Sequence, residues 1–295
     1  MKNTTMYQTP TFRKTTTAFF AAATMLATVL PFQAASAEEK PKHEKASFPS
    51  GLDHSKWDML LKKYVDEEGL VDYAGWKANA ADVGTLDSYL ATYAPKTETP
   101  ASGDELGAAT ANAYNAFIIR EVLKEYPIES IMSEKGPFGA KIHEVGGKKI
   151  SLDDIEKGNS IPTIGWKAHG IFVCVARSCP PLQREAYTKD KLQEQVDTAY
   201  TKWLARTDLN LFLPAENEAK LSMIFKWYKA DFDKEGGVAK VISQYVPEAY
   251  KELLAKEDLK IDHFTYNWGL NDQGKHGRNY GAGSKLIDGA LKLFK

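Results

Sequence analysis

Apolar residues recur every three to four positions along much of this chain, which is the spacing of an amphipathic helix. The pattern predicts helices over 55–66, around 86–90, over 104–126, over 188–205, from about 216, over 238–246 and over 248–255. Three short stretches rich in β-branched or aromatic residues predict strands over 70–73, 148–152 and 261–270. Many helices with few short strands predict an α+β domain, in which a small, mostly antiparallel sheet is flanked by helices.

A continuous apolar run leads to the two cysteines of the chain. Residues 168–175 are mostly apolar, and two prolines that cannot donate the hydrogen bonds of a sheet follow shortly after. The run therefore predicts a buried strand, with His169 at its entry and Cys179 in the loop at its exit. Because Cys174 and Cys179 both lie here, any covalent thiol chemistry is expected in this stretch.

The first residues have the pattern of an export signal. A basic start precedes a mostly apolar run, and Ala35-Ser36-Ala37 has the small residues of a cleavage site. The apolar run is shorter than the roughly 20 residues that span a bilayer, although an uncleaved anchor is the alternative. We therefore predict a signal peptide over 1–37, a flexible tether over 38–52 and one globular domain over 53–295. The protein would be periplasmic or secreted, with no membrane span after cleavage.

The charge of the chain is nearly balanced, with 38 basic and 39 acidic residues and a net charge of −1. No sequence-wide field attracts nucleic acid or an anionic membrane, so a nucleic-acid partner is not expected. The six histidines show no i,i+4 pairing and no neighbouring Cys-x-x-Cys motif, and the chain has no Gly-rich phosphate loop. We therefore expect neither a metal site nor a cofactor.

The predicted helix over 104–126 carries two asparagines among apolar residues. At a period of 3.6, Asn112 and Asn115 share a face with Ile119 and Leu123. Asparagine is a mediocre helix former because its amide competes for nearby backbone groups. Two asparagines on an apolar face therefore indicate a polar role inside the protein. Both amides could cross-brace the core, or one could orient a catalytic group or a substrate.

Several segments resemble one known family in the right order over roughly 53–272. The hallmark is His169-x-x-Phe172-Val173-Cys174 followed by Ser178-Cys179-Pro180-Pro181-Leu182, which resembles the family catalogued as domain of unknown function 547. Four further segments fit the same family: Asn112-Ala113-Tyr114-Asn115-Ala116, Ile150-Ser151-Leu152-Asp153-Asp154-Ile155-Glu156, Leu221 to Phe232, and Tyr266-Asn267-Trp268-Gly269-Leu270-Asn271.

The resemblance implies a fold more than an activity, because the family has no settled function. Its polar helix followed by a histidine-led strand is similar to the papain and transglutaminase group of thiol enzymes. In that group the nucleophilic cysteine begins the helix, whereas here the helix carries Asn112 and Asn115 and no cysteine. Lys157 stands where the family often has histidine, and Ala109-Thr110-Ala111 where it often has Phe-Trp. Both departures weaken the transfer of a shared active site.

One hypothesis for the central stretch is a thiol enzyme that hydrolyses or transfers an amide or thioester. His169 would deprotonate Cys179, and Asn115 or Glu156 would hold the imidazole in one tautomer. The ten steps from His169 to Cys179 would span about 33 Å if fully extended. The hypothesis therefore requires either that the chain folds back after Val175 or that a different residue acts as the base.

Two other hypotheses leave the thiols out of catalysis. A disulfide between Cys174 and Cys179 needs a turn, because five extended steps span about 16 Å and bridged Cα atoms lie about 5.5 Å apart. An oxidising compartment favours such a bridge. In the last hypothesis both thiols are inert, His169 is a core histidine, and the chain is a non-catalytic binding or structural domain. Asn112 and Arg177 would then contact an unknown small-molecule or peptide ligand.

Overall fold

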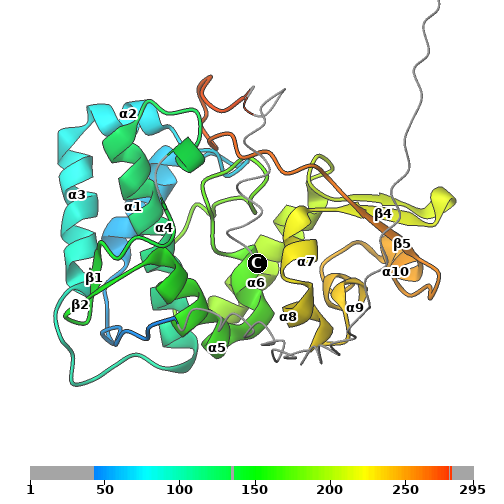
Figure 1. Cartoon of the computed structure of the whole chain (residues 1–295), viewed down its shortest axis with the longest axis horizontal. Helices are drawn as coiled ribbons and strands as arrows, with labels where there is room; N and C mark the ends of the chain where they lie inside the picture. Colours follow the sequence, from blue (N-terminus) through cyan, green and yellow to red (C-terminus); the bar gives the residue numbers. More distant parts are fainter. Residues whose placement is uncertain (1–42, 134–135, 279, 281–295) are drawn as a thin grey trace, which may run out of the picture. The chain divides into compact units, whose positions relative to one another are not determined.

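The computed structural model describes residues 43–133, 136–278 and 280 (Figure 1). The predicted signal peptide over 1–37 and the first part of the predicted tether lie outside the described residues. The described residues form an α+β arrangement of helices and short strands, as the sequence predicted.

Ten α-helices fall within the described ranges: α1 (Ser55–Tyr64), α2 (Tyr73–Ala78), α3 (Ala80–Leu90), α4 (Gly103–Glu125), α5 (Ile161–Ile164), α6 (Leu192–Ala205), α7 (Met223–Trp227), α8 (Lys229–Asp233), α9 (Val238–Ile242) and α10 (Glu248–Leu254). Short 3₁₀ segments are η1 (Ala91–Tyr93), η2 (Ile131–Ser133), η4 (Gly165–Gly170) and η5 (Pro214–Glu216), and η3 (Asp154–Ser160) is a π-helix. Within this part of the chain, no helix combines the length and the hydropathy needed to cross a bilayer.

Two small sheets are present in the described residues, and they are mostly antiparallel. The first is a hairpin of β1 (His143–Val145) and β2 (Lys148–Ile150). In the second, β4 (Glu218–Leu221) pairs antiparallel with β3 (Leu211–Leu213) and parallel with β5 (Lys260–His263). Two expectations need correction here. The helix expected from about 216 is replaced by β4 and the separate α7, and the strand expected over 261–270 is shortened to β5.

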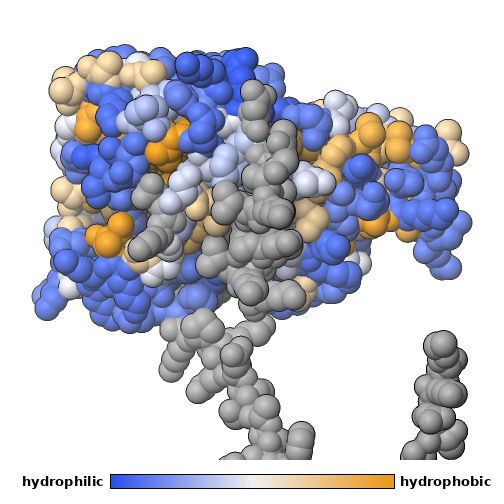
Figure 2. All heavy atoms as spheres, turned by 45° about the horizontal axis from the view of Figure 1, so that its top comes forward, coloured by the Kyte–Doolittle hydropathy of each residue, from blue (hydrophilic) through white to orange (hydrophobic). Residues whose placement is uncertain are grey.

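Helix α4 is buried on most of its circumference. It contacts α2, α3, α5, α6 and η3, which come from both sides of it in the sequence (Figure 1). A helix surrounded in this way is mostly apolar on all its faces, and its small residues Ala108, Ala109, Ala111, Ala113 and Ala116 allow close approach. Outside this core, Figure 2 shows a face on which hydrophilic residues predominate.

The strand expected over 168–175 does not form. His169 belongs to the 3₁₀ segment η4, and the chain continues as irregular backbone through the cysteines. The Asn115 amide replaces a neighbouring strand, because it donates to the Ile171 carbonyl and accepts from the Val173 N–H, both at 2.9 Å. The apolar run is buried as expected, but a side chain satisfies two of its backbone polar groups.

Asn112 braces the chain in the same way one helical turn earlier. Its amide donates to the Tyr187 carbonyl at 2.8 Å and accepts from the Tyr187 N–H at 2.9 Å. The two asparagines of α4 therefore hold two separate irregular segments by matched pairs of hydrogen bonds. Both amides therefore cross-brace buried backbone, and the expected catalytic role of Asn115 and binding role of Asn112 stay predictions.

The expected flexible tether over 38–52 is wrong for its described part. Phe48 is fully buried, and Ala46 is nearly so. The Asn159 amide accepts from the Ala46 N–H at 3.1 Å and donates to the Ala46 carbonyl at 2.8 Å. The segment was expected to be flexible because of its charged composition, but Ala46 and Phe48 pack into the core. Asn159 satisfies the backbone of Ala46, just before Phe48.

Candidate functional site

A cavity of about 120 Å³ lies beside the two cysteines. Its described lining residues are mostly apolar or aromatic, and Asp153, Glu156 and His169 are among them. The full described lining is Tyr114, Gly136, Pro137, Phe138, Gly139, Asp153, Glu156, His169, Phe172, Cys174, Cys179, Ile224, Trp227, Tyr228 and Tyr266. An apolar cavity with a few converging polar groups is the usual form of a small-molecule site. We therefore take this cavity as the candidate functional site.

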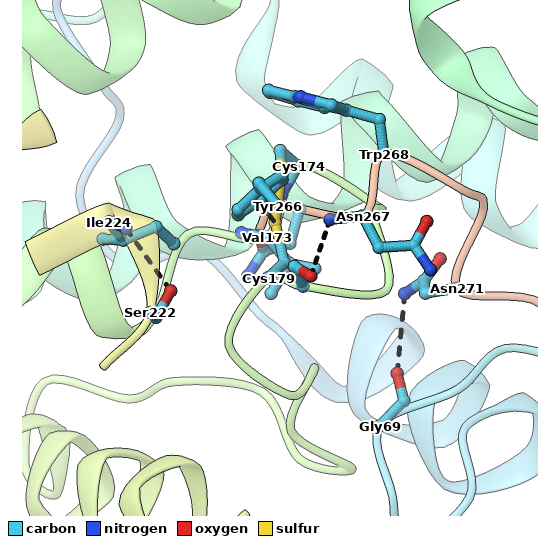
Figure 3. Close-up of a disulfide and its surroundings, with 12 residues drawn as sticks. Gly69, Val173, Cys174, Cys179, Ser222, Ile224, Tyr266, Asn267, Trp268 and Asn271 are labelled. Atoms are coloured by element: carbon cyan, nitrogen blue, oxygen red, sulfur yellow. Dashed lines mark hydrogen bonds between the residues drawn. A yellow bond between two sulfur atoms is a disulfide. The ribbon is translucent and has the colours of Figure 1, made fainter. Parts of the chain in front are cut away.

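Cys174 and Cys179 form a disulfide that lines the cavity (Figure 3). The chain turns back between them, which brings their Cα atoms to 6.2 Å, and the Cys179 N–H donates to the Ala176 carbonyl at 3.1 Å. The Tyr266 hydroxyl lies 3.0 Å from the Cys174 sulfur and 3.1 Å from the Cys179 sulfur. In this state neither sulfur is a free thiol.

His169 is held by a carboxylate from a distant part of the chain. Its side chain is fully buried at the end of η4, and its Nε2 lies 3.0 Å from Oδ2 of Asp231 in α8. The hydrogen bond from His169 lowers the pKa of Asp231 to about 2. Ionised Asp231 must therefore accept from an Nε2–H, and in the tautomer that donates from Nε2 the lone pair of the ring is on Nδ1.

The other nitrogen of His169 faces a second carboxylate. Its Nδ1 lies 3.8 Å from Oε1 of Glu156 and has no hydrogen-bond partner among the described residues. Burial raises the pKa of Glu156, against the opposing effects of the charges on His169 and Lys157 and of a hydrogen bond from Tyr228. A carboxyl group with a raised pKa beside an unpartnered imidazole nitrogen is a pair that can exchange a proton.

The Tyr228 ring fixes the position of both members of this pair. It stacks on the His169 ring, with a centroid distance of 3.8 Å and an interplanar angle of 23°. Its hydroxyl also bonds the Glu156 carboxylate. Neither the imidazole nor the carboxyl group can therefore turn away from the cavity without losing a buried contact.

The structure brings only some of the sequence candidates to the cavity. His169, Glu156 and Cys179 line it, whereas Asn115 supports the backbone beside it. The other two do not line it. The Asn112 amide is used by backbone groups, and the Arg177 guanidinium donates to the Asp272 carbonyl at 2.7 Å.

Sequence reasoning did not find three residues that complete the site. Asp231 and Tyr228 lie about 60 positions after His169, and Tyr266 lies 87 positions after Cys179. The segments that contain them, 221–232 and 266–271, were among those that carry the family resemblance. That resemblance was the one signal that marked these segments, and it did not indicate which residues act.

The described residues contain no group of three or more histidine, cysteine, aspartate or glutamate side chains arranged to hold a metal ion. Comparison with family models, with curated proteins and with solved structures finds no match to this chain. The chemistry of the site therefore has to follow from its own residues.

Proposed function

We propose that this chain is a thiol-dependent enzyme that transfers or hydrolyses an acyl group, with Cys179 as nucleophile and His169 as base. The observation that carries the proposal is that both residues line one cavity. The pairing of His169 with Asp231 supports it, because that pairing leaves Nδ1 as the nitrogen available to accept a proton. Glu156 would stabilise the imidazolium that forms.

The nucleophile becomes available only when the disulfide is opened. A dithiol reductant would supply two electrons and two protons, so that the S–S bond breaks, Cys174 and Cys179 become thiols, and the reductant becomes a disulfide. The Tyr266 hydroxyl, which contacts both sulfurs, would then be positioned to donate to the Cys179 thiolate. The enzyme would therefore be inactive while the disulfide is closed and would become active on reduction.

The acyl-transfer step would use His169 twice. Nδ1 would take the Cys179 proton while the sulfur attacks the acyl carbon, and the same proton would pass to the departing amine or thiol. Water would then attack the thioester, the carbon–sulfur bond would break, and the Cys179 thiol would be restored. A cavity of about 120 Å³ has room for one small group of a substrate, so the remainder would lie outside.

The first experiment is a free-thiol count on the unreduced protein with site assignment by mass spectrometry. The second exposes Cys174→Ser, in which Cys179 is free without reductant, to p-nitrophenyl acetate. We expect an acetyl thioester on Cys179, and we expect His169→Ala in the same background to slow its formation. Cys179→Ser, which leaves Cys174 free, is the matched control and should remain unacylated. Equal, slow acylation of the single thiols in the two variants would overturn the proposal. Equal, slow acylation of Cys174 and Cys179 in reduced wild-type protein would overturn it as well.

A second candidate is a non-catalytic binding domain for a small molecule or peptide. The disulfide itself favours this candidate, because neither sulfur is then a nucleophilic thiol and the bridge forms part of the cavity wall. Ligand binding by the unreduced protein, with no acylation of the reduced protein, would support it over the thiol enzyme.

A periplasmic or secreted location is part of the proposal. A disulfide is typical of oxidising compartments, so the bridge is consistent with the predicted export signal. The resemblance to the family of unknown function 547 and the analogy to papain-like and transglutaminase-like folds also remain proposals. The α+β class of the fold supports the analogy, and so do a histidine and a cysteine that share a cavity.

A further inference from the structure

Aromatic rings form much of the cavity wall. Six of its described lining residues are aromatic: Tyr114, Phe138, Phe172, Trp227, Tyr228 and Tyr266. Several of these rings pack on one another, with centroids 4.7 Å apart for Tyr114 and Phe172 and for Trp227 and Tyr266. Aromatic faces attract cations, and rings assembled around a cavity are the form in which proteins bind quaternary or methylated ammonium groups.

Apart from His169, the charged side chains in the described lining of the cavity are acidic. The described lining contains the carboxyl groups of Asp153 and Glu156 and no lysine or arginine. Lys157 is paired with Asp153 at 2.6 Å, so Asp153 already has a cationic partner. Glu156 has no lysine or arginine ion pair among the described residues, and its nearest basic group is His169 at 3.8 Å. A ligand cation could therefore pair with Glu156, which has no lysine or arginine partner among the described residues.

We infer that the cavity accepts an alkylammonium group, with Glu156 as its counter-ion and the aromatic side chains around it. The inference names the substrate class of the same cavity, and it rests on the proposed function for the choice of that site. An alkylammonium head is compact enough for about 120 Å³. The bound head would lie beside His169 and Glu156. An amine-bearing side chain of a peptide, or a small amine, would there be held close to Cys179.

The test compares choline with its neutral carbon isostere, 3,3-dimethylbutan-1-ol, by calorimetric titration of unreduced wild-type protein. The two probes have nearly the same shape, so the difference between them reports charge alone. We expect choline to bind about tenfold more tightly, which is the scale of a desolvated cation–aromatic attraction. Glu156→Gln should lose most of this preference, while the alcohol should bind the variant and the wild type equally. Glu144→Gln, on the exposed face of β1, is the matched control.

Equal or tighter binding of the alcohol by wild-type protein would overturn the inference and leave an apolar site. Absence of binding of both probes at millimolar concentration would overturn it as well. Both results are obtained without any variant, so a Glu156→Gln protein that fails to fold does not affect them. The disulfide is closed throughout the titration. Failure of acylation at Cys179 and failure of choline binding are therefore separate results.

Discussion

The Nε2 atom of His169 lies 3.0 Å from Oδ2 of Asp231, although the two residues are 62 positions apart in the chain. This contact joins η4 to α8, and it determines which nitrogen of the ring remains available in the cavity. Because the contact lowers the pKa of Asp231 to about 2, it is also a source of stability that depends on pH.

Asp231→Asn should lose stability at neutral pH and little in strong acid. Ionised Asp231 stabilises the folded chain above its ordinary pKa of about 4, and this contribution disappears as the pH falls through about 2. Urea unfolding at pH 6 and pH 2.5 would measure it, and the difference between variant and wild type should shrink at the lower pH. Asp190→Asn, at an exposed position, is the control. A difference that stays constant over this range would show that the charge of Asp231 is not its cause.

Glu156→Gln should have the opposite pH dependence. Burial raises the pKa of Glu156, so the folded chain prefers the protonated carboxyl group. Stability from this group is complete below its ordinary pKa of about 4.3 and is lost as the pH rises through the folded-state pKa. The variant keeps the shape and carries no charge. We therefore expect it to equal the wild type near pH 4 and to exceed it at pH 7 in urea unfolding. A variant less stable than wild type at pH 7 would contradict this reasoning.

Asn115→Ala should destabilise the protein more than an ordinary loss of a side-chain hydrogen bond. The substitution leaves the Ile171 carbonyl and the Val173 N–H buried without partners, at a cost of about 2–5 kcal/mol for the two groups. Asn79→Ala is the matched comparison, because Asn79 caps α3 through one bond to the Asp82 N–H and its loss should cost about 1 kcal/mol. Chemical denaturation of both variants measures the difference. Similar values for the two would mean that water reaches the backbone behind Asn115.

The sequence predicted the helices better than the site, and the reason lies in the range of the interactions. Periodicity is local, so the long buried helix α4 and the position of Asn112 and Asn115 on its apolar surface were predictable. The same local pattern could not distinguish a buried strand from an irregular buried segment in 168–175. That outcome depends on an amide more than 50 positions away.

The candidate site shows the same limit. His169, Cys179 and Glu156 were named because their chemistry is visible in single residues. The pairing with Asp231 and the Tyr266 contact to both sulfurs arise only when distant segments pack together. Arg177 was expected at a ligand, but its guanidinium is used by a backbone carbonyl of the C-terminal part of the chain.

Removal of the disulfide should cost stability without unfolding the protein. The bridge closes a short loop of five residues, and the loss of its constraint on the unfolded chain corresponds to about 2 kcal/mol. Wild-type protein in the presence and absence of a dithiol reductant, and the Cys174→Ser/Cys179→Ser variant without it, should give matching differences in urea unfolding. Unfolding of the reduced protein in the absence of urea would show that the bridge is essential to the fold, and the reduced enzyme proposed above could not then exist.

Gly170→Ala tests how closely the segment that carries His169 is packed. A Cβ atom at Gly170 would lie 2.2 Å from Cε2 of Tyr200, far inside van der Waals contact. The Tyr200 ring cannot move away easily, because it is fully buried and its hydroxyl donates to the Trp166 carbonyl at 2.9 Å. We expect a loss of about 1–3 kcal/mol in the free energy of unfolding.

Gly84→Ala is the matched control for this substitution. Gly84 is exposed within α3, and no atom lies near the position of an added Cβ. The same change should there stabilise the protein by about 0.5–1 kcal/mol, because alanine is the better helix former. Thermal and urea unfolding should therefore shift in opposite directions for the two variants. A neutral Gly170→Ala would mean that η4 can move away from Tyr200, and the position of His169 beside Asp231 would then be less constrained than the packing indicates.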